Sequence, residues 1–517
     1  MLGFCNLSRA FAAVALFLPG TLPAQGVPAP PLAPVAFVGV TVVDVEHGTL
    51  LPNQTVVVAG GRIERVEESH RALPPGTTVI PARGRYLLPG LWDMHVHLAA
   101  VAIDRLGNRP GNYEINASWH LPLFLAHGVT GVRDMAGNFR MLRTWRDQIA
   151  SGERAGPRIV HTGWKIGAAE PVVPRAPRDP HTESDLRRAV ALAADAGVDF
   201  IKVETLQPEE LRVVAEEAHK RGLQVVGHVG PWMTLRTASE LGLDGVEHLH
   251  QGVAAGSAED DALAESADRE FSWWGERLVR IGWWDHARRR RQRAERMLVT
   301  WDSVTEARTI EVLVRNHTEQ TPTLSALRDI QRIQPEIPPA RLAWLPPKIL
   351  RTDTTDKAVG PWREQIFVNQ FALQMRVTRM MQRAGVPILA GTDSPGTRRV
   401  PGMSLVDELE LLVEAGLTNL EALQAATIAP ARFMRMSDSL GTVTPGKVAD
   451  LVLVDENPLA SLGALRSVRA VVAGGRYYSR EELDRRLEGV REVLAQLRRD
   501  AAPSAVASDG AAPGSNP

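Results

Sequence analysis

Short apolar runs alternate with longer amphipathic stretches through the central part of the chain. Stretches such as 209–221 and 418–429 have the periodicity of helices, and they separate runs that have the length of strands. This alternation is typical of βα units, which build a parallel sheet. The run at 88–98 and seven later ones make eight, the number of strands in a (β/α)8 TIM barrel, and we predict that α/β fold. The later candidate strands are residues 129–134, 157–163, 198–204, 223–229, 244–249, 318–324 and 386–393.

Both ends of the chain carry short strands separated by glycine turns. Residues 35–43, 55–58 and 62–66 form one group, and a second group follows at 449–454 and 468–473. We expect these groups to form one small β-sandwich built from both ends of the chain. The predicted domains are a β-sandwich part at 25–86, the barrel at 87–438, a second β-sandwich part at 439–490 and a disordered tail at 501–517.

A long excursion at 255–317 separates the sixth and seventh predicted strands. Connections of this length are uncommon in compact domains, where they often serve a function. Its tryptophans are interpreted either as the core of the excursion or as a lid over a pocket. They are Trp273, Trp274, Trp283, Trp284 and Trp301.

The overall composition is that of a soluble globular protein, with 44% hydrophobic and 23% charged residues among 517. The formal net charge of -1 provides no general electrostatic attraction for nucleic acid or for an anionic membrane. We therefore expect a small-molecule substrate, with no nucleic-acid partner and no stable membrane insertion. Assembly into a homo-oligomer stays open.

The N-terminus has the layout of a secretory signal peptide. Arg9 precedes the apolar run at 10–18, and small residues follow up to Ala24. The run is much shorter than the roughly 20 residues needed to cross a bilayer. We predict a signal peptide at 1–24 and a secreted or periplasmic protein. The single cysteine, Cys5, lies within this segment, so metal ligands in the mature chain must be His, carboxylate or Lys.

Two histidines end the first predicted strand of the barrel. His95 and His97 are two positions apart, so their side chains lie on one face and could bind the same metal ion. Because 14 His in 517 residues give roughly 0.4 such pairs by chance, the pair alone is weak evidence. His228 and His248 end two later strands, and active sites of TIM barrels lie at these strand ends. Four neutral imidazoles suit a divalent metal such as zinc.

Lys202 and Asp393 also end predicted strands. A carbamylated Lys202 would carry a carboxylate able to bridge two zinc ions, whereas an ion pair with Glu204 or Asp393 would leave a site for one metal. For Asp393 we predict a catalytic role as metal ligand and proton shuttle, and a turn-capping role is the alternative. A metal-bound hydroxide would then attack the substrate directly. A serine nucleophile is disfavoured, because no Gly-x-Ser-x-Gly motif lies near these residues.

These motifs resemble those of the amidohydrolase superfamily, in particular its imidazolonepropionase-related and Xaa-Pro-peptidase-like branch. The resemblance implies that His95 and His97 hold a more buried metal, which Asp393 completes. It also implies that His228 and His248 hold a more exposed metal and that Lys202 bridges both. The matching segments are Pro89-Gly90-Leu91-Trp92-Asp93-Met94-His95-Val96-His97, Phe200-Ile201-Lys202, Gly227-His228, Val246-Glu247-His248, Gly391-Thr392-Asp393-Ser394 and residues 441–452.

Three further residues are candidates for binding the substrate. Arg133 ends the second strand and could pair with a substrate carboxylate, although a buried ion pair is an equal alternative. His161 ends the third strand, and Tyr113 follows the first.

We predict a metal-dependent hydrolase that cleaves an amide-type C–N bond, with dipeptide-like or N-acyl amino acid substrates. The alternatives are hydrolysis of an ester, lactone or phosphoester at the same site, or an inactive barrel that serves as an envelope binding protein.

Overall fold

The computed structural model describes most of the chain. The predicted signal peptide at 1–24, residues 502–517 of the predicted tail and four tryptophans of the excursion (Trp273, Trp274, Trp283 and Trp284) lie outside the described residues. Within the described part, no helix combines the length and the apolar character needed to cross a membrane. The described residues are 32–68, 71–99, 110–167, 172–177, 180–204, 206–249, 251–271, 286–331, 338–354, 361–396 and 398–501.

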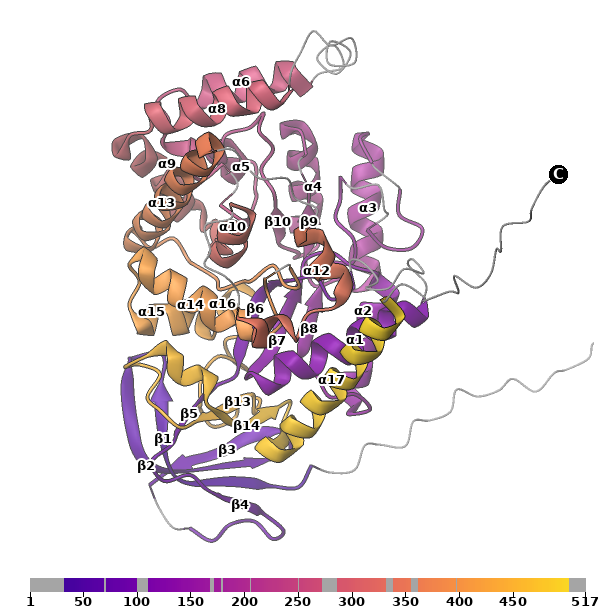
Figure 1. The fold of residues 1–517 in the computed structure, drawn as a ribbon, viewed down its shortest axis with the longest axis vertical. Helices are drawn as coiled ribbons and strands as arrows, with labels where there is room; N and C mark the ends of the chain where they lie inside the picture. The colour runs from indigo at the N-terminus through magenta and orange to yellow at the C-terminus, as the bar shows by residue number, and fades with distance from the viewer. Residues whose placement is uncertain are drawn as a thin grey trace, which may run out of the picture. The chain divides into compact units, whose positions relative to one another are not determined.

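Strands from both ends of the chain share one sheet (Figure 1). Its strand order is β15-β14-β13-β5-β1-β2-β3, and β4 pairs with β1. The two groups meet where β5 pairs antiparallel with β13, with Leu87 opposite Leu453. The strands are β1 (Val35–Asp44), β2 (Thr49–Ala59), β3 (Arg62–Glu67), β4 (Thr78–Pro81), β5 (Tyr86–Pro89), β13 (Leu451–Val454), β14 (Val468–Ala473) and β15 (Arg476–Ser479).

The central part of the chain contributes seven parallel strands in two further sheets, one of order β6-β7-β8 and one of order β12-β11-β10-β9. Each lies within a predicted strand. They are β6 (Leu91–Val96), β7 (Val129–Asp134), β8 (Arg158–His161), β9 (Ile201–Val203), β10 (Val225–Gly227), β11 (Gly245–Glu247) and β12 (Glu319–Thr321).

Helices follow most of these strands, so the central region is α/β as predicted. They are α1 (Pro110–Ala126), α2 (Phe139–Ser151), α3 (Glu183–Ala196), α4 (Pro208–Lys220), α5 (Leu235–Glu240), α6 (Asp260–Phe271), α8 (His286–Thr300), α9 (Ser303–Asn316), α10 (Leu324–Ile330), α11 (Pro339–Leu342), α12 (Pro347–Thr354), α13 (Pro361–Ala384), α14 (Met403–Ala415), α15 (Asn419–Ala425), α16 (Ile428–Phe433) and α17 (Arg480–Ala501). The excursion at 255–317 contains α6, α8 and α9. Its Trp301 donates a hydrogen bond to Glu306 and lies under Arg376.

The eighth predicted strand, 386–393, does not form a regular strand. Single parallel bridges at Ile388 and Ser394 connect this segment to β12 and β6, and a third bridge joins Ile166 to Val203 of β9. At Gly391, a Cβ atom would lie 2.8 Å from the Cβ of His95. The close approach to β6 and the hydrogen bond from Ala390 N to Ala425 O interrupt the ladder.

The helix predicted at 418–429 is also broken. It ends at Ala425 and resumes at Ile428, and Thr427 has the non-helical dihedrals φ -134° and ψ -78°. The carbonyl of Ala426 accepts a hydrogen bond from Trp92 N of β6, at 2.8 Å. Because the Ala426 carbonyl accepts this hydrogen bond from β6, it is not available for a hydrogen bond within a continuous helix.

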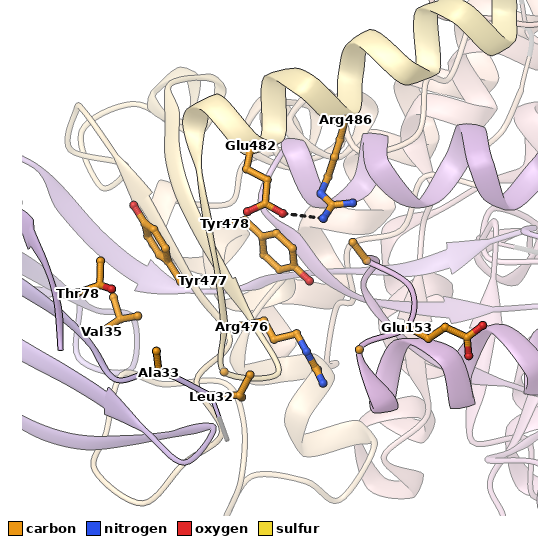
Figure 2. Close-up of a pocket in the computed structure, with 13 residues that line it drawn as sticks. Leu32, Ala33, Val35, Thr78, Glu153, Arg476, Tyr477, Tyr478, Glu482 and Arg486 are labelled. Carbon is orange, nitrogen blue, oxygen red and sulfur yellow. Dashed lines mark hydrogen bonds and ion pairs between the residues drawn. The ribbon is translucent and has the colours of Figure 1, made fainter. Parts of the chain in front are cut away.

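A cavity of about 460 Å³ lies beside β15, between the end of α2 and α17 (Figure 2). Arg476, Tyr478 and Arg486 are among its lining residues, and Arg486 donates to Glu482 at 2.6 Å. None of the predicted site residues lines it.

Leu453→Ala should destabilise the protein by about 2–5 kcal/mol, because it removes a fully buried side chain from the core that both ends of the chain share. Chemical denaturation measures this loss, with Leu51→Ala on a strand surface as the matched control, since Leu51 is 41% exposed. Equal stability of the two variants would contradict a shared core.

Candidate metal centre

Three predicted ligands converge among the described residues. One ligand atom each from His95, His248 and Asp393 lies within 4.8 Å of the others. The rings of His95 and His248 are 4.4 Å apart between centroids, and the ring of His228 is 5.2 Å from that of His248. The side chains come from the ends of β6, β10 and β11 and from the segment that bridges to β6. The structure therefore contains a His/Asp cluster with the composition of a metal site.

His97 joins this cluster through Asp393. Its Nε2 lies 3.2 Å from Asp393 Oδ1, and His95 Nε2 lies 3.6 Å from the same oxygen. Asp393 N donates to His95 O at 2.7 Å, which ties the backbone of the carboxylate to the strand of the two histidines. One carboxylate oxygen thus faces both imidazoles of the His-x-His pair.

A buried hydrogen-bond network holds the backbone ahead of Asp393. Asp93 is fully buried and accepts hydrogen bonds from the amide of Thr392, at 2.9 Å, and from its hydroxyl, at 2.6 Å. Since burial costs a carboxylate its hydration, the pKa of Asp93 rises to about 7 despite these bonds. Asp93 thereby anchors the turn that carries Asp393.

All four predicted histidine ligands have Nδ1 in contact with a protein oxygen. A carbonyl can only accept, and an ionised carboxylate can only accept, so in three of the four cases Nδ1 carries the proton. The neutral imidazole then leaves Nε2 as the ligand atom. The contacts are His95 to Glu247 Oε2 at 2.6 Å, His97 to Ala136 O at 3.3 Å, His228 to Glu204 Oε1 at 2.5 Å and His248 to Thr323 Oγ1 at 2.7 Å.

Burial also sets the protonation states of the cluster. It lowers the pKa values of His95 and His248 well below 6.5, so both rings are neutral at physiological pH. Burial would also lower the pKa of His97, but its hydrogen bond to Asp393 raises it. For Asp393, burial opposes ionisation, yet His97 and Arg399 hold its pKa well below the usual range. The cluster thus offers the neutral imidazoles of His95 and His248 and an ionised carboxylate, which His97 contacts.

Lys202 lies on β9, and its side chain is 1% exposed. Its Nζ has no hydrogen-bond partner in the described part of the chain. Burial lowers the pKa of this amine to about 8. Glu204, a possible ion-pair partner of Lys202 from the sequence, instead contacts His228 and Lys165.

The donor set fits a divalent metal such as zinc. Nε2 atoms of oriented imidazoles and a carboxylate are zinc ligands, and metal-bound His commonly has its other nitrogen fixed by a carboxylate or carbonyl. The buried amine of Lys202 makes no hydrogen bond within the described part of the chain, and the charges of Glu247 and Glu204 offset only part of the cost of its burial.

Sequence reasoning did not identify the carboxylates behind the histidines. Glu247 is fully buried on β11 and bonds both His95 and Arg133. The signal was present, because a Glu inside an apolar strand one position before His248 requires a buried partner. From the sequence, Glu204 is a candidate only for an ion pair with Lys202.

The three candidate substrate residues are all buried among other residues of the chain. Arg133 is 1% exposed and donates to Met94 O at 2.6 Å, to Glu247 at 2.8 Å and to Thr321 at 3.0 Å. His161 is fully buried, lies 5.6 Å from Phe139 between ring centroids, and shows no hydrogen-bond partner for its ring nitrogens among the described residues.

Tyr113 is 1% exposed and belongs to the main hydrophobic core. A role in substrate binding stays a prediction for all three residues.

Comparison with known proteins identifies a family whose profile matches much of the chain. The sequence profile of the amidohydrolase family matches residues 86–267 and 373–478, which together make up more than half of the chain. Adenine deaminase 3 of Rhizobium meliloti is 25% identical over 256 residues, or 47% of this chain. The match spans only 39% of that curated relative.

Two solved structures cover the chain more fully. A crystal structure of a Xaa-Pro dipeptidase with bound methionine aligns with 86% of this chain and all of its own, at a TM-score of 0.62 and 21% identity. A candidate prolidase from Bifidobacterium longum covers 89% of this chain and all of its own, at a TM-score of 0.61 and 27% identity. At 21% identity, the similarity to the Xaa-Pro dipeptidase shows a shared fold alone.

Thr392→Val should destabilise the protein by about 1–3 kcal/mol, because buried Asp93 loses the hydroxyl that donates to it. We also expect lower metal occupancy, since the adjacent Asp393 loses its anchor. Denaturation and metal analysis measure both effects. Thr442→Val is the control, because its hydroxyl bonds Thr444 at an exposed turn. Unchanged metal content in Thr392→Val would contradict the anchoring role of Asp93.

Proposed function

Since the chain belongs to the amidohydrolase family, we propose that it hydrolyses carbon–nitrogen bonds of amide type in small molecules. The observation that carries this proposal is the cluster of His95, His248 and Asp393, in which His95 has its second nitrogen held by protein. When bound there, a divalent metal supplies an activated water and polarises the substrate carbonyl.

Asp393 is the residue that we propose to move protons. It is ionised in the folded protein because His97 and Arg399 lower its pKa. A carboxylate in this state accepts a proton from the attacking water and returns it to the leaving nitrogen. The Arg399 side chain donates to Asp393 O at 3.1 Å and lies 3.5 Å from its Oδ2, which orients the carboxylate.

We further propose that the site takes two zinc ions bridged by carbamylated Lys202. The amine would attack carbon dioxide, form an N–C bond and release a proton, which creates a carboxylate at the end of the side chain. The burial of Nζ without a hydrogen-bond partner supports this modification. His95, His97 and Asp393 would hold one metal, and His228 and His248 the other.

Dipeptide-like or N-acyl amino acid substrates are proposed from the 27% identity to the candidate prolidase. We also propose that the parallel strands close into the predicted (β/α)8 barrel and that the terminal sheet forms the predicted β-sandwich. The bridges at Ile166, Ile388 and Val96, which connect the ends of the two parallel sheets, support closure. Export by the predicted signal peptide is part of the same proposal.

A substrate panel tests the reaction class. We expect zinc-loaded protein to hydrolyse dipeptides or N-acyl amino acids, and chelation should abolish turnover until zinc is restored. Expression with bicarbonate should give about two zinc equivalents. Turnover of lactones or a phosphotriester alone would contradict the amide proposal, and protein that binds no zinc would favour an inactive binding protein.

Substitution of proposed ligands should separate chemistry from folding. His228→Ala and Asp393→Asn should each lower turnover by about two to four orders of magnitude, as loss of a catalytic group does, with little change in melting temperature. His47→Ala is the matched control, because the His47 side chain is 70% exposed. Steady-state kinetics and thermal unfolding provide the readouts, and near-normal rates would remove the substituted residue from the mechanism.

A further inference from the structure

Two of the histidines in the cluster share an arrangement that their neighbours lack. The Nδ1 of His95 contacts Glu247, and Glu247 in turn accepts a hydrogen bond from Arg133 at 2.8 Å. The Nδ1 of His228 contacts Glu204, and Glu204 forms an ion pair with Lys165. Each imidazole is therefore backed by a carboxylate, and each carboxylate by a cation.

The other two histidines have neutral oxygens at Nδ1. His97 contacts the carbonyl of Ala136, and His248 contacts the hydroxyl of Thr323. In the proposed centre, each metal position would thus have one imidazole with a charged partner and one with a neutral partner. The two positions are matched in this respect, and they differ in that Asp393 would join only the position of His95 and in the burial of the two ion pairs.

Burial distinguishes the two ion pairs. The side chains of Arg133 and Glu247 are 1% and 0% exposed, whereas those of Lys165 and Glu204 are 29% and 24% exposed. Dissolved ions reach exposed charges and screen them, but they screen buried pairs much less. The Arg133–Glu247 pair is also fixed by bonds from Arg133 to Met94 O and Thr321.

A carboxylate at Nδ1 fixes the tautomer and ring orientation of a metal-binding histidine and makes it a better ligand. The cation behind it holds the carboxylate in place against the ring. Loss of such a partner typically costs about 10–100-fold in metal affinity. The buried pair keeps this effect as salt rises, whereas the partly buried pair, which solvent ions reach, loses part of it.

We propose that Arg133–Glu247 and Lys165–Glu204 are positioning pairs that give the two metal positions unequal retention, firm at His95 and labile and salt-sensitive at His228. This inference rests on the proposed two-metal centre. It gives Arg133 a structural task, since its guanidinium is occupied by protein partners.

Zinc release from the full-length, zinc-loaded protein into a colorimetric chelator tests the proposal without measuring turnover. We expect a fast and a slow phase of about one equivalent each. Raising salt from about 0.01 M to 1 M shortens the Debye length from roughly 30 Å to 3 Å, and it should accelerate only the fast phase.

Lys165→Met should accelerate the fast phase about 10–100-fold and abolish its salt dependence, whereas Lys165→Arg should restore both. Glu247→Gln, which keeps an acceptor but removes the charge, should accelerate the slow phase. Arg65→Met is the control, because it removes a partly buried ion pair with Glu67 on β3, and both phases should remain unchanged.

These outcomes distinguish a failure of the proposed function from a failure of this inference alone. Wild-type protein that binds no zinc overturns the proposed function and this inference together. Two bound zinc ions with an unchanged fast phase in folded Lys165→Met overturn the inference alone. Equal acceleration of both phases in that variant also contradicts it, since a general loss of structure would act on both positions.

Discussion

The candidate centre depends on a single constraint: a buried imidazole has two nitrogens, and protein oxygens already contact one of them. At His95, His97, His228 and His248 the partner behind the ring contacts Nδ1, so Nε2 is the atom that would bind a shared ligand. Any buried imidazole gains from such a partner, but these four rings also lie together, so that a common ligand can reach them. The contacts cost the conformational freedom of four side chains, and a common ligand is the physical reason to accept that cost.

The same requirement shapes the backbone around the cluster. Asp393 must reach the first pair of histidines, so the segment that carries it approaches β6 more closely than a side chain at position 391 would allow. The segment keeps hydrogen bonds to both neighbouring strands but does so one residue at a time. Asp93 accepts the two Thr392 hydrogen bonds that hold this irregular path. Irregular geometry of this kind is common where a strand delivers a functional residue.

Charge is unevenly distributed around the candidate centre. The neutral rings of His95 and His248 and the ionised carboxylate of Asp393 lie together, and two ion pairs of different burial lie behind two of the histidines. The chain belongs to the amidohydrolase family, and 89% of it aligns with a candidate prolidase at 27% identity. The cavity beside β15 lies among other residues, so it belongs to the terminal sheet and α17 rather than to this chemistry.

The order of strands and helices, and the histidines, lysine and aspartate at the strand ends, could be predicted from local pattern. Strand periodicity places His95 and His97 on one face whatever the rest of the chain does. The contacts of Glu247 with His95 and with Arg133 could not be predicted in this way. Glu247 lies 152 residues from His95 and 114 residues from Arg133 in the chain. The breaks at Gly391 and Ala426 likewise arise from contacts with β6. Local sequence therefore determined which side chains lie at the ends of the strands. Packing between distant strands decided which of them contact one another, because a buried charge needs a partner and only the fold brings that partner close.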